Sequence, residues 1–234
     1  MFLVTCRLFQ LVFVNKNERQ QAKGNKQQAR RFGGGHPTDS LVGELPAKST
    51  RVSLEFTDGS KLYFNDQRKF GWMRLLPAIE IPEIDFFKKV GPEPLDDDFT
   101  VGIFVDRLMR RKNSNIKSVL LDQTVVAGIG NIYADESLWG AKIHPAMLVG
   151  EIPKSKLVLL YNSLREILAL SIAKGGSTDK NYVDAEGKKG SYLSFANVFR
   201  KQGQPCPRCG TPIEKIRVAG RGTHICPKEQ KLPK

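Results

Sequence analysis

The chain has 234 residues, of which 40% are hydrophobic, enough to bury one sizeable core or two smaller ones. Its 37 Lys and Arg residues against 24 Asp and Glu give a formal net charge of +13. This excess favours a polyanionic partner, most directly nucleic acid, because basic side chains that neutralise phosphates release condensed counterions. The alternative is a soluble basic protein with solvated lysines, whereas the lack of a long apolar helix argues against a membrane partner.

Residues 1–14 are rich in apolar, β-branched and aromatic side chains. The segment lacks the basic start and the small-residue cleavage site of a signal peptide, and Arg7 and Gln10 interrupt it. It therefore predicts a strand rather than an export signal. With only four cysteines in the chain, we expect a protein of the reducing cytoplasm.

Residues 15–31 form a polar run that predicts an exposed loop, and the glycines at 33–35 continue it. Beyond them, apolar residues alternate with polar ones on both sides of Asp58 and Gly59, which is typical of a β-hairpin. We expect a β-rich domain over residues 1–76. Four prolines between residues 77 and 94 predict an irregular linker between domains.

The segment 95–195 is expected to be helical. Three aspartates at 96–98 suit the N-cap and first turn of a helix that carries apolar residues at helical spacing. We expect a second helix over 118–126, a third from Asn131 to about Trp139, and a fourth over 154–174.

A glycine turn separates the second and third of these helices. Gly128 and Gly130 allow a tight turn that leaves free backbone N–H groups and the Asn131 side chain at a helix N-terminus, where the dipole favours an anion. The turn thus suits phosphate binding. Glycine turns also occur in ordinary bundles, and Asn131 is alternatively only a helix cap.

Three cysteines and a glutamate near the C-terminus have the spacing of a zinc ribbon. Cys206 and Cys209 are followed, after sixteen residues, by Cys226 and Glu229, each pair being two residues apart. The pattern predicts a ribbon β-hairpin within 196–234 and a structural zinc ion. Zinc accepts carboxylate oxygen, so we expect Glu229 as the fourth ligand, with His224 as a second candidate; the alternative is a site that no longer binds metal.

Three segments together closely resemble the formamidopyrimidine-DNA glycosylase and endonuclease VIII family, and its formamidopyrimidine branch most. They are Asn-Asp-Gln-Arg-Lys-Phe-Gly at 65–71, the run from Leu-Leu-Asp-Gln at 120–123 through Gly-Ile-Gly-Asn-Ile-Tyr-Ala-Asp-Glu at 128–136, and the ribbon with Arg221. The resemblance covers about 34–229. It implies an α+β fold: an incomplete N-terminal β-sandwich, a helix-two-turns-helix domain and a C-terminal zinc-ribbon hairpin.

The resemblance also implies a base-excision-repair glycosylase with AP-lyase activity on oxidised purines. Such a protein is expected to be a monomer at the nucleoid that grips bent duplex DNA and flips the damaged base. Residues 175–192 resemble the family's loop that closes over that base. The residues with implied DNA-binding roles are Arg68 and Phe70 as a wedge, Lys69 and Lys117 near the backbone, and Asn131 and Arg221 on phosphates. Arg221 is implied in the elimination step as well.

The chain departs from the family at the catalytic start. The family's nucleophile is an N-terminal proline followed by glutamate, whereas Phe2 and Leu3 stand here and the Glu44-Leu45-Pro46 segment is internal. The sequence is thus either a truncated or frameshifted copy of a repair gene or a DNA-binding descendant that does not cut. A non-catalytic duplex-binding module and, below it, an RNA-binding zinc-ribbon protein are the alternative functions.

Simpler roles remain for the implied site residues. Arg68 and Phe70 are alternatively a strand-end surface residue and a core residue, and Arg221 is alternatively one more solvated charge.

Overall fold

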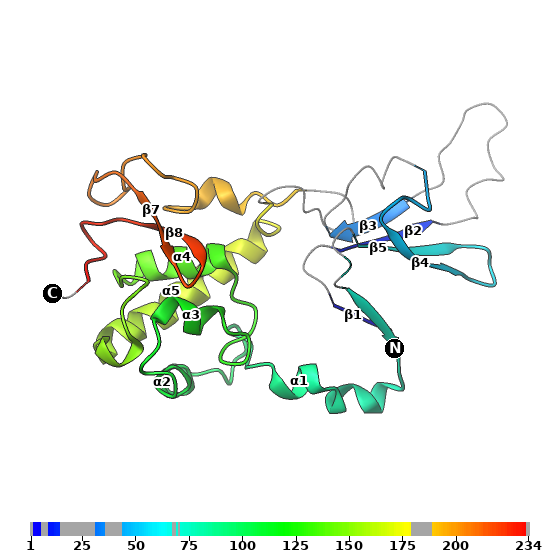
Figure 1. Cartoon of the computed structure of the whole chain (residues 1–234), viewed down its shortest axis with the longest axis horizontal. Helices are drawn as coiled ribbons and strands as arrows, with labels where there is room; N and C mark the ends of the chain where they lie inside the picture. Colours follow the sequence, from blue (N-terminus) through cyan, green and yellow to red (C-terminus); the bar gives the residue numbers. More distant parts are fainter. Residues whose placement is uncertain are drawn as a thin grey trace. The chain divides into compact units, whose positions relative to one another are not determined.

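The computed structural model describes residues 2–5, 9–14, 31–35, 44–66, 69, 71–178 and 189–232. The chain divides into two compact units (Figure 1). Unit 1 comprises Met1–Ile81 and Lys174–Leu193, and unit 2 comprises Pro82–Ala173 and Ser194–Lys234. The boundary after Ile81 falls inside the segment with the four prolines.

Unit 1 contains two antiparallel sheets. In one, β1 (Phe2–Thr5) pairs with β6 (Trp72–Leu75). The other has the order β3-β2-β5-β4. Its strands are β2 (Phe9–Val14), β3 (Arg31–Gly35), β4 (Thr50–Glu55) and β5 (Lys61–Asp66). The apolar start therefore supplies two strands, and the β-rich character predicted for this part is confirmed.

The β4–β5 hairpin follows the predicted alternation. Leu54 lies opposite Leu62 and Val52 opposite Phe64. Gly59 has φ of 79°, a conformation that glycine adopts without steric cost.

Two expectations for this region were wrong. The glycines at 33–35 lie in β3, which pairs with β2 over its whole length, because backbone hydrogen bonds hold a strand without any side chain. The segment with the prolines is partly regular, with a 3₁₀ helix η3 (Ala78–Glu83) and the short helix α1 (Asp85–Lys89). Proline restricts φ to a value that helical turns share, so it fits such short pieces.

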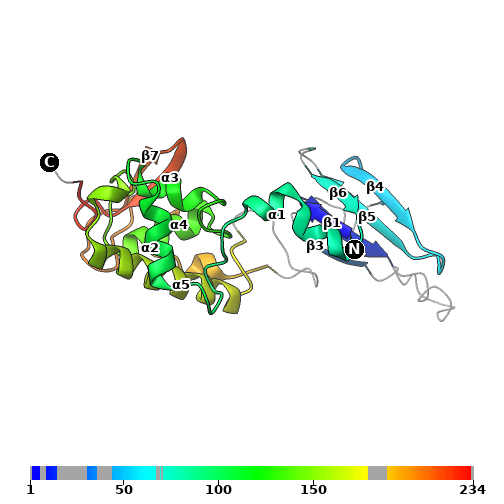
Figure 2. The same cartoon turned by 90° about the horizontal axis from the view of Figure 1, so that it is seen from below.

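Unit 2 is built from four longer helices with short connections (Figure 2). They are α2 (Val101–Met109), α3 (Ile116–Leu121), α4 (Asn131–Gly140) and α5 (Lys154–Ala173). A 3₁₀ turn, η4 (Val149–Glu151), lies between α4 and α5, and another, η5 (Tyr192–Phe195), spans the boundary between the units after Leu193. None of the helices in the described ranges is both long and apolar enough for a membrane crossing.

The ends of the first two helices differ from the predictions. Thr100, rather than an aspartate of 96–98, caps α2, because its hydroxyl accepts a hydrogen bond from the Ile103 N–H. Asn115 caps α3 in the same way through the Ser118 N–H at 2.8 Å. Since residues 122–128 form turns rather than helix, α3 starts and ends earlier than the predicted 118–126.

The core of unit 2 gathers apolar side chains from all four helices. Its largest fully buried members include Phe104, Ile116, Leu120, Leu138 and Leu160. A separate smaller cluster joins Trp139 of α4 to the ribbon cysteines and to Val198 and Ile213. The helix α4 therefore contacts both the helical core and the ribbon.

The ribbon hairpin is formed as predicted. Strand β7 (Glu214–Val218) pairs with β8 (Arg221–Ile225) through a two-residue turn. Ala219 and Gly220 both have positive φ, 51° and 72°, which is the geometry of a type I′ turn and matches the twist of the strands. Strand β8 packs on α4, so the hairpin turn lies near the helix that follows the glycine turn.

Candidate nucleic-acid interface and metal centre

The glycine turn before α4 is fixed by one side chain. Gln123 donates to the Ile129 carbonyl at 3.0 Å and accepts from the Gly128 N–H at 2.9 Å. Gly128 has φ of +73°, which a side chain would make unfavourable. The turn delivers Gly130 as the N-cap of α4, with no side chain that occupies the first N–H groups of the helix.

Asn131 does not act as a cap of its own helix. Its amide nitrogen donates to the Gly222 carbonyl of β8 at 3.1 Å. An amide nitrogen carries two hydrogens, so the second is left for a ligand. The neighbouring Arg221 is exposed, and within the described ranges no hydrogen bond or ion pair engages its guanidinium. Asn131 of α4 thus binds the residue that directly follows Arg221 in β8, although the two elements are far apart in sequence.

Lys117 is buried, with a fully inaccessible side chain. Its ammonium group donates to Asp135 Oδ1 and to Thr223 Oγ1, both at 2.6 Å. Burial lowers the pKa of Lys117, and the carboxylate of Asp135 acts in the opposite direction. In this arrangement Lys117 holds the hairpin, so its contact with the DNA backbone stays a prediction.

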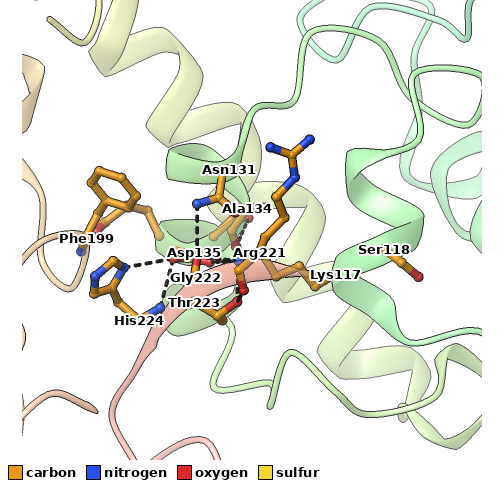
Figure 3. Close-up of polar contacts among 12 residues, drawn as sticks. Lys117, Ser118, Asn131, Ala134, Asp135, Phe199, Arg221, Gly222, Thr223 and His224 are labelled. Carbon is orange, nitrogen blue, oxygen red and sulfur yellow. Dashed lines mark hydrogen bonds and ion pairs between the residues drawn. The ribbon is translucent and has the colours of Figure 1, made fainter. Parts of the chain in front are cut away.

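Asp135 completes a hydrogen-bonded cluster beneath the hairpin. Its second oxygen accepts from the His224 backbone N–H at 2.9 Å and lies 3.2 Å from the His224 ring nitrogen Nδ1. Figure 3 shows Asp135 between His224 and Lys117, with the guanidinium of Arg221 directed away from the cluster. Asp135 of α4 therefore holds strand β8, which begins at Arg221.

The predicted wedge lies in unit 1. Arg68 and Phe70 lie outside the described residues. Lys69 is exposed and has φ of 59°, an uncommon conformation for a residue with a side chain. Asp66 and Gly71, which flank these residues in the sequence, are joined by a hydrogen bond from the Gly71 N–H to the Asp66 carboxylate at 2.6 Å.

The three ribbon cysteines converge. The sulfur atoms of Cys206, Cys209 and Cys226 all lie within 4.8 Å of one another. The hydrogen bond from Thr211 lowers the pKa of Cys209 to about 7, whereas burial raises the pKa of Cys226 to about 11. These three closely grouped thiols supply three of the four donors that a structural zinc ion requires. The residues present fit the metal.

The two candidates for a fourth ligand are engaged elsewhere. The Glu229 carboxylate forms ion pairs with Arg208 and, at 3.4 Å, with Lys142. The His224 ring packs against Phe199 and faces Asp135. Arg208 also stacks on Trp139, with its guanidinium carbon 3.7 Å from the ring centroid. Glu229 therefore remains a predicted ligand whose carboxylate must leave Arg208 to reach the metal.

Two kinds of site feature were not singled out from the sequence. Asp135 and Glu136 belong to the segment at 128–136, but it is their burial, visible only in the structure, that marks them as site residues. In addition, a hollow of about 280 Å³ is lined by Arg107, Arg110 and Arg111 of the α2 end and by Thr124 and Val125. Arg107 lies in the last turn of α2, Arg110 is its C-cap, and Arg111 follows in a turn.

Comparisons with known proteins agree with this architecture. The family model described as the formamidopyrimidine-DNA glycosylase H2TH domain matches residues 90–182, and the zinc finger found in FPG and IleRS matches residues 203–228. The formamidopyrimidine-DNA glycosylase of Lactobacillus acidophilus is 44% identical over 187 residues, which cover 80% of this chain and 67% of that protein. The enzyme of Chloroflexus aggregans is 45% identical over 198 residues, covering 85% and 71%.

Solved structures give the same answer. The Lactococcus lactis Fpg in complex with DNA containing an abasic site has a TM-score of 0.75 at 33% identity and covers 99% of this chain and 75% of that one. Its complex with DNA containing N7-benzyl-Fapy-dG has a TM-score of 0.76 at 34% identity and the same coverage. The order of the motifs, the fold and the identity over most of the chain lead to one conclusion: this chain belongs to the formamidopyrimidine-DNA glycosylase family.

Proposed function

We propose that the chain is a base-excision-repair DNA glycosylase with AP-lyase activity on oxidised purines, acting at the nucleoid in the cytoplasm. The observation that carries the proposal is the hydrogen bond from Asn131, in the first turn of α4, to Gly222, which places Asn131 beside the residue that directly follows Arg221 in β8. Family membership supports the same activity, since the relatives are named as formamidopyrimidine-DNA glycosylases and one solved neighbour holds DNA with an abasic site.

The geometry suits the DNA backbone. The N-terminus of α4 offers backbone N–H groups and a favourable dipole to an anion. Asn131 adds a directed N–H, and Arg221 adds a charge with a planar set of donors that matches phosphate oxygens. Because a phosphate contact carries no base identity, this grip would position the duplex and leave lesion choice to other residues.

The loop at 65–71 is the proposed wedge. Arg68 and Phe70 are carried over from the resemblance, with Phe70 replacing lost stacking and Arg68 facing the orphaned base. The hydrogen bond from Gly71 to Asp66 joins the two described residues that flank Arg68 and Phe70 in the sequence. Lys69, exposed on the same loop, is proposed to approach the backbone.

A structural zinc ion is part of the proposal. Cys206, Cys209 and Cys226 would hold it, with Glu229 as the fourth ligand. When bound, zinc fixes the ribbon that carries Arg221 and takes no part in the reaction. Its loss would thus affect DNA binding through the hairpin.

A second candidate function is duplex binding without glycosylase chemistry. The observation that favours it is that Asn131 and Arg221, the proposed phosphate ligands, both lie in unit 2, whereas the family's chemistry requires a terminal proline amine and a glutamate. A secondary amine attacks the sugar and forms an imine in that chemistry, and the carboxylate moves protons. The phosphate grip of unit 2 needs neither group.

Borohydride trapping separates the two functions. The chain is mixed with duplex DNA that carries an aldehydic abasic site, and binding of the same duplex is measured by fluorescence anisotropy. A covalent adduct supports the lyase, since only an imine is reduced and trapped; a duplex with a tetrahydrofuran site, which has no aldehyde, is the control. Binding with no adduct supports the second candidate, and no binding contradicts both.

A further inference from the structure

One carboxylate connects the elements that carry the proposed phosphate ligands. Asp135 is fully buried, and an ionised group in that position is costly unless it is paired and hydrogen-bonded. Both of its oxygens are used: Oδ1 faces the ammonium group of Lys117, and Oδ2 faces the backbone N–H and ring of His224. It thereby joins α3, α4 and β8.

The contacts continue to Arg221. Besides its bond to Asp135, the Lys117 ammonium group donates a hydrogen bond to Thr223 Oγ1 at 2.6 Å and lies 3.4 Å from the Gly222 carbonyl oxygen. Thr223 in turn donates to the Arg221 carbonyl at 3.1 Å. Every residue of β8 from 221 to 224 is therefore held by this cluster or by Asn131.

Asn131 belongs to the same arrangement through the helix. It precedes Asp135 by four residues, so both side chains lie on one face of α4. Asn131 binds the strand at Gly222 while Asp135 binds it at His224. The spacing of the helix is thus matched to the spacing of the strand (Figure 3).

We propose that Asp135 is a positioning residue for DNA binding, which acts through Lys117 and His224 to set β8 so that Arg221 and Asn131 bind backbone phosphates together. The inference rests on the proposed phosphate grip of Arg221. It assigns to Asp135 an effect on affinity for DNA in addition to its effect on stability. Asp135 itself contacts no DNA.

The alternative is a buried ion pair that only stabilises the fold. The two roles differ in the salt dependence of binding, whose slope counts the phosphate contacts made by charged groups. If Asp135 positions Arg221, its loss removes that contact although Arg221 is still present. A residue with a purely structural role leaves the slope of the folded protein unchanged.

The experiment measures affinity for a duplex with a tetrahydrofuran site at several salt concentrations, for Asp135→Asn, Arg221→Ala and the double variant. Asp106→Asn, an exposed position on α2, is the matched control for the change of one charge. We expect Arg221→Ala and Asp135→Asn each to weaken binding on the order of tenfold and to lower the salt slope by about one. The double variant should bind no more weakly than the weaker single variant, because both lose the same contact.

Zinc content and thermal unfolding identify variants that are not folded. Should Asp135→Asn fail that check, Thr223→Val decides, since it keeps the ion pair and removes only the bonds from Lys117 and to the Arg221 carbonyl; it too should lower the slope. If Arg221→Ala leaves affinity unchanged, the proposed phosphate grip fails. The inference about Asp135 is overturned if Arg221→Ala weakens binding while Asp135→Asn, or Thr223→Val in its place, keeps the salt slope of the parent. It is also overturned if the double variant loses affinity by the product of the two single losses.

Discussion

Glu136 holds the segment that leads into the ribbon. Its buried carboxylate accepts four hydrogen bonds, from the N–H groups of Asn197, Val198 and Phe199 and from the Asn197 side chain. A carboxylate suits this position, because both of its oxygens accept hydrogen bonds and neither donates one. The residue therefore fixes where the chain leaves η5 and enters the ribbon.

Replacing Glu136 with Gln keeps the shape and turns one acceptor into a donor that faces N–H groups. We expect the free energy of unfolding to fall by roughly 2 to 4 kcal/mol, because at least two buried donors lose their acceptor. Urea unfolding followed by circular dichroism measures the change. Glu166→Gln on the exposed face of α5 is the control and should stay within about 0.5 kcal/mol of the parent; equal stability of the two variants would contradict the assignment.

Glu229 gives a second prediction at the scale of one residue. If it is the fourth ligand, Glu229→Gln should weaken binding of Co²⁺, used in place of zinc, by at least about tenfold. Glu229→Cys should strengthen binding, since thiolates are the preferred donors of such sites, and should add thiolate-to-cobalt absorption. Spectroscopic titration with Co²⁺ measures both. Unchanged affinity in the Gln variant would show that Arg208 and Lys142 retain the carboxylate.

The helix α4 organises unit 2 at the scale of elements. Its first residue, Asn131, binds Gly222 of β8, and Asp135 binds β8 at His224. Glu136 binds the segment before the ribbon, and Trp139 packs against the ribbon cysteines. The ribbon is thus docked along one helix rather than folded alone. The helical core, by contrast, is a separate apolar cluster.

This separation predicts the effect of metal removal. A chelator should weaken the affinity for DNA at least as much as Arg221→Ala does, because zinc binding supplies much of the folding free energy of a ribbon and Arg221 lies on its hairpin. Helical circular dichroism should be largely retained, because the apolar core formed by α2 to α5 does not include the cysteines. Adding zinc back is the control and should restore binding; chelated protein that binds DNA as tightly as before would contradict the role of the ribbon.

Across the whole molecule, the elements that could be predicted from the sequence are those that depend on residues close together in the chain. The β4–β5 hairpin followed from alternation around Asp58 and Gly59, and the ribbon followed from cysteine spacing. The burial of Lys117 was not, because it depends on Asp135, 18 residues away, and Thr223, 106 residues away. A lysine is ordinarily exposed, so only tertiary contacts could reveal that this one lies inside.

The net charge of +13 gives the molecule a general attraction for DNA, so affinity alone does not test the proposed site. The decisive measurement is the affinity of the parent, Asn131→Ala and Arg221→Ala for a duplex with a tetrahydrofuran site as the salt concentration is raised. We expect both variants to bind on the order of tenfold more weakly, with the slope lowered by about one for Arg221→Ala and unchanged for the uncharged Asn131. Parent-like affinity and slope in both variants would contradict the phosphate grip on which the account rests.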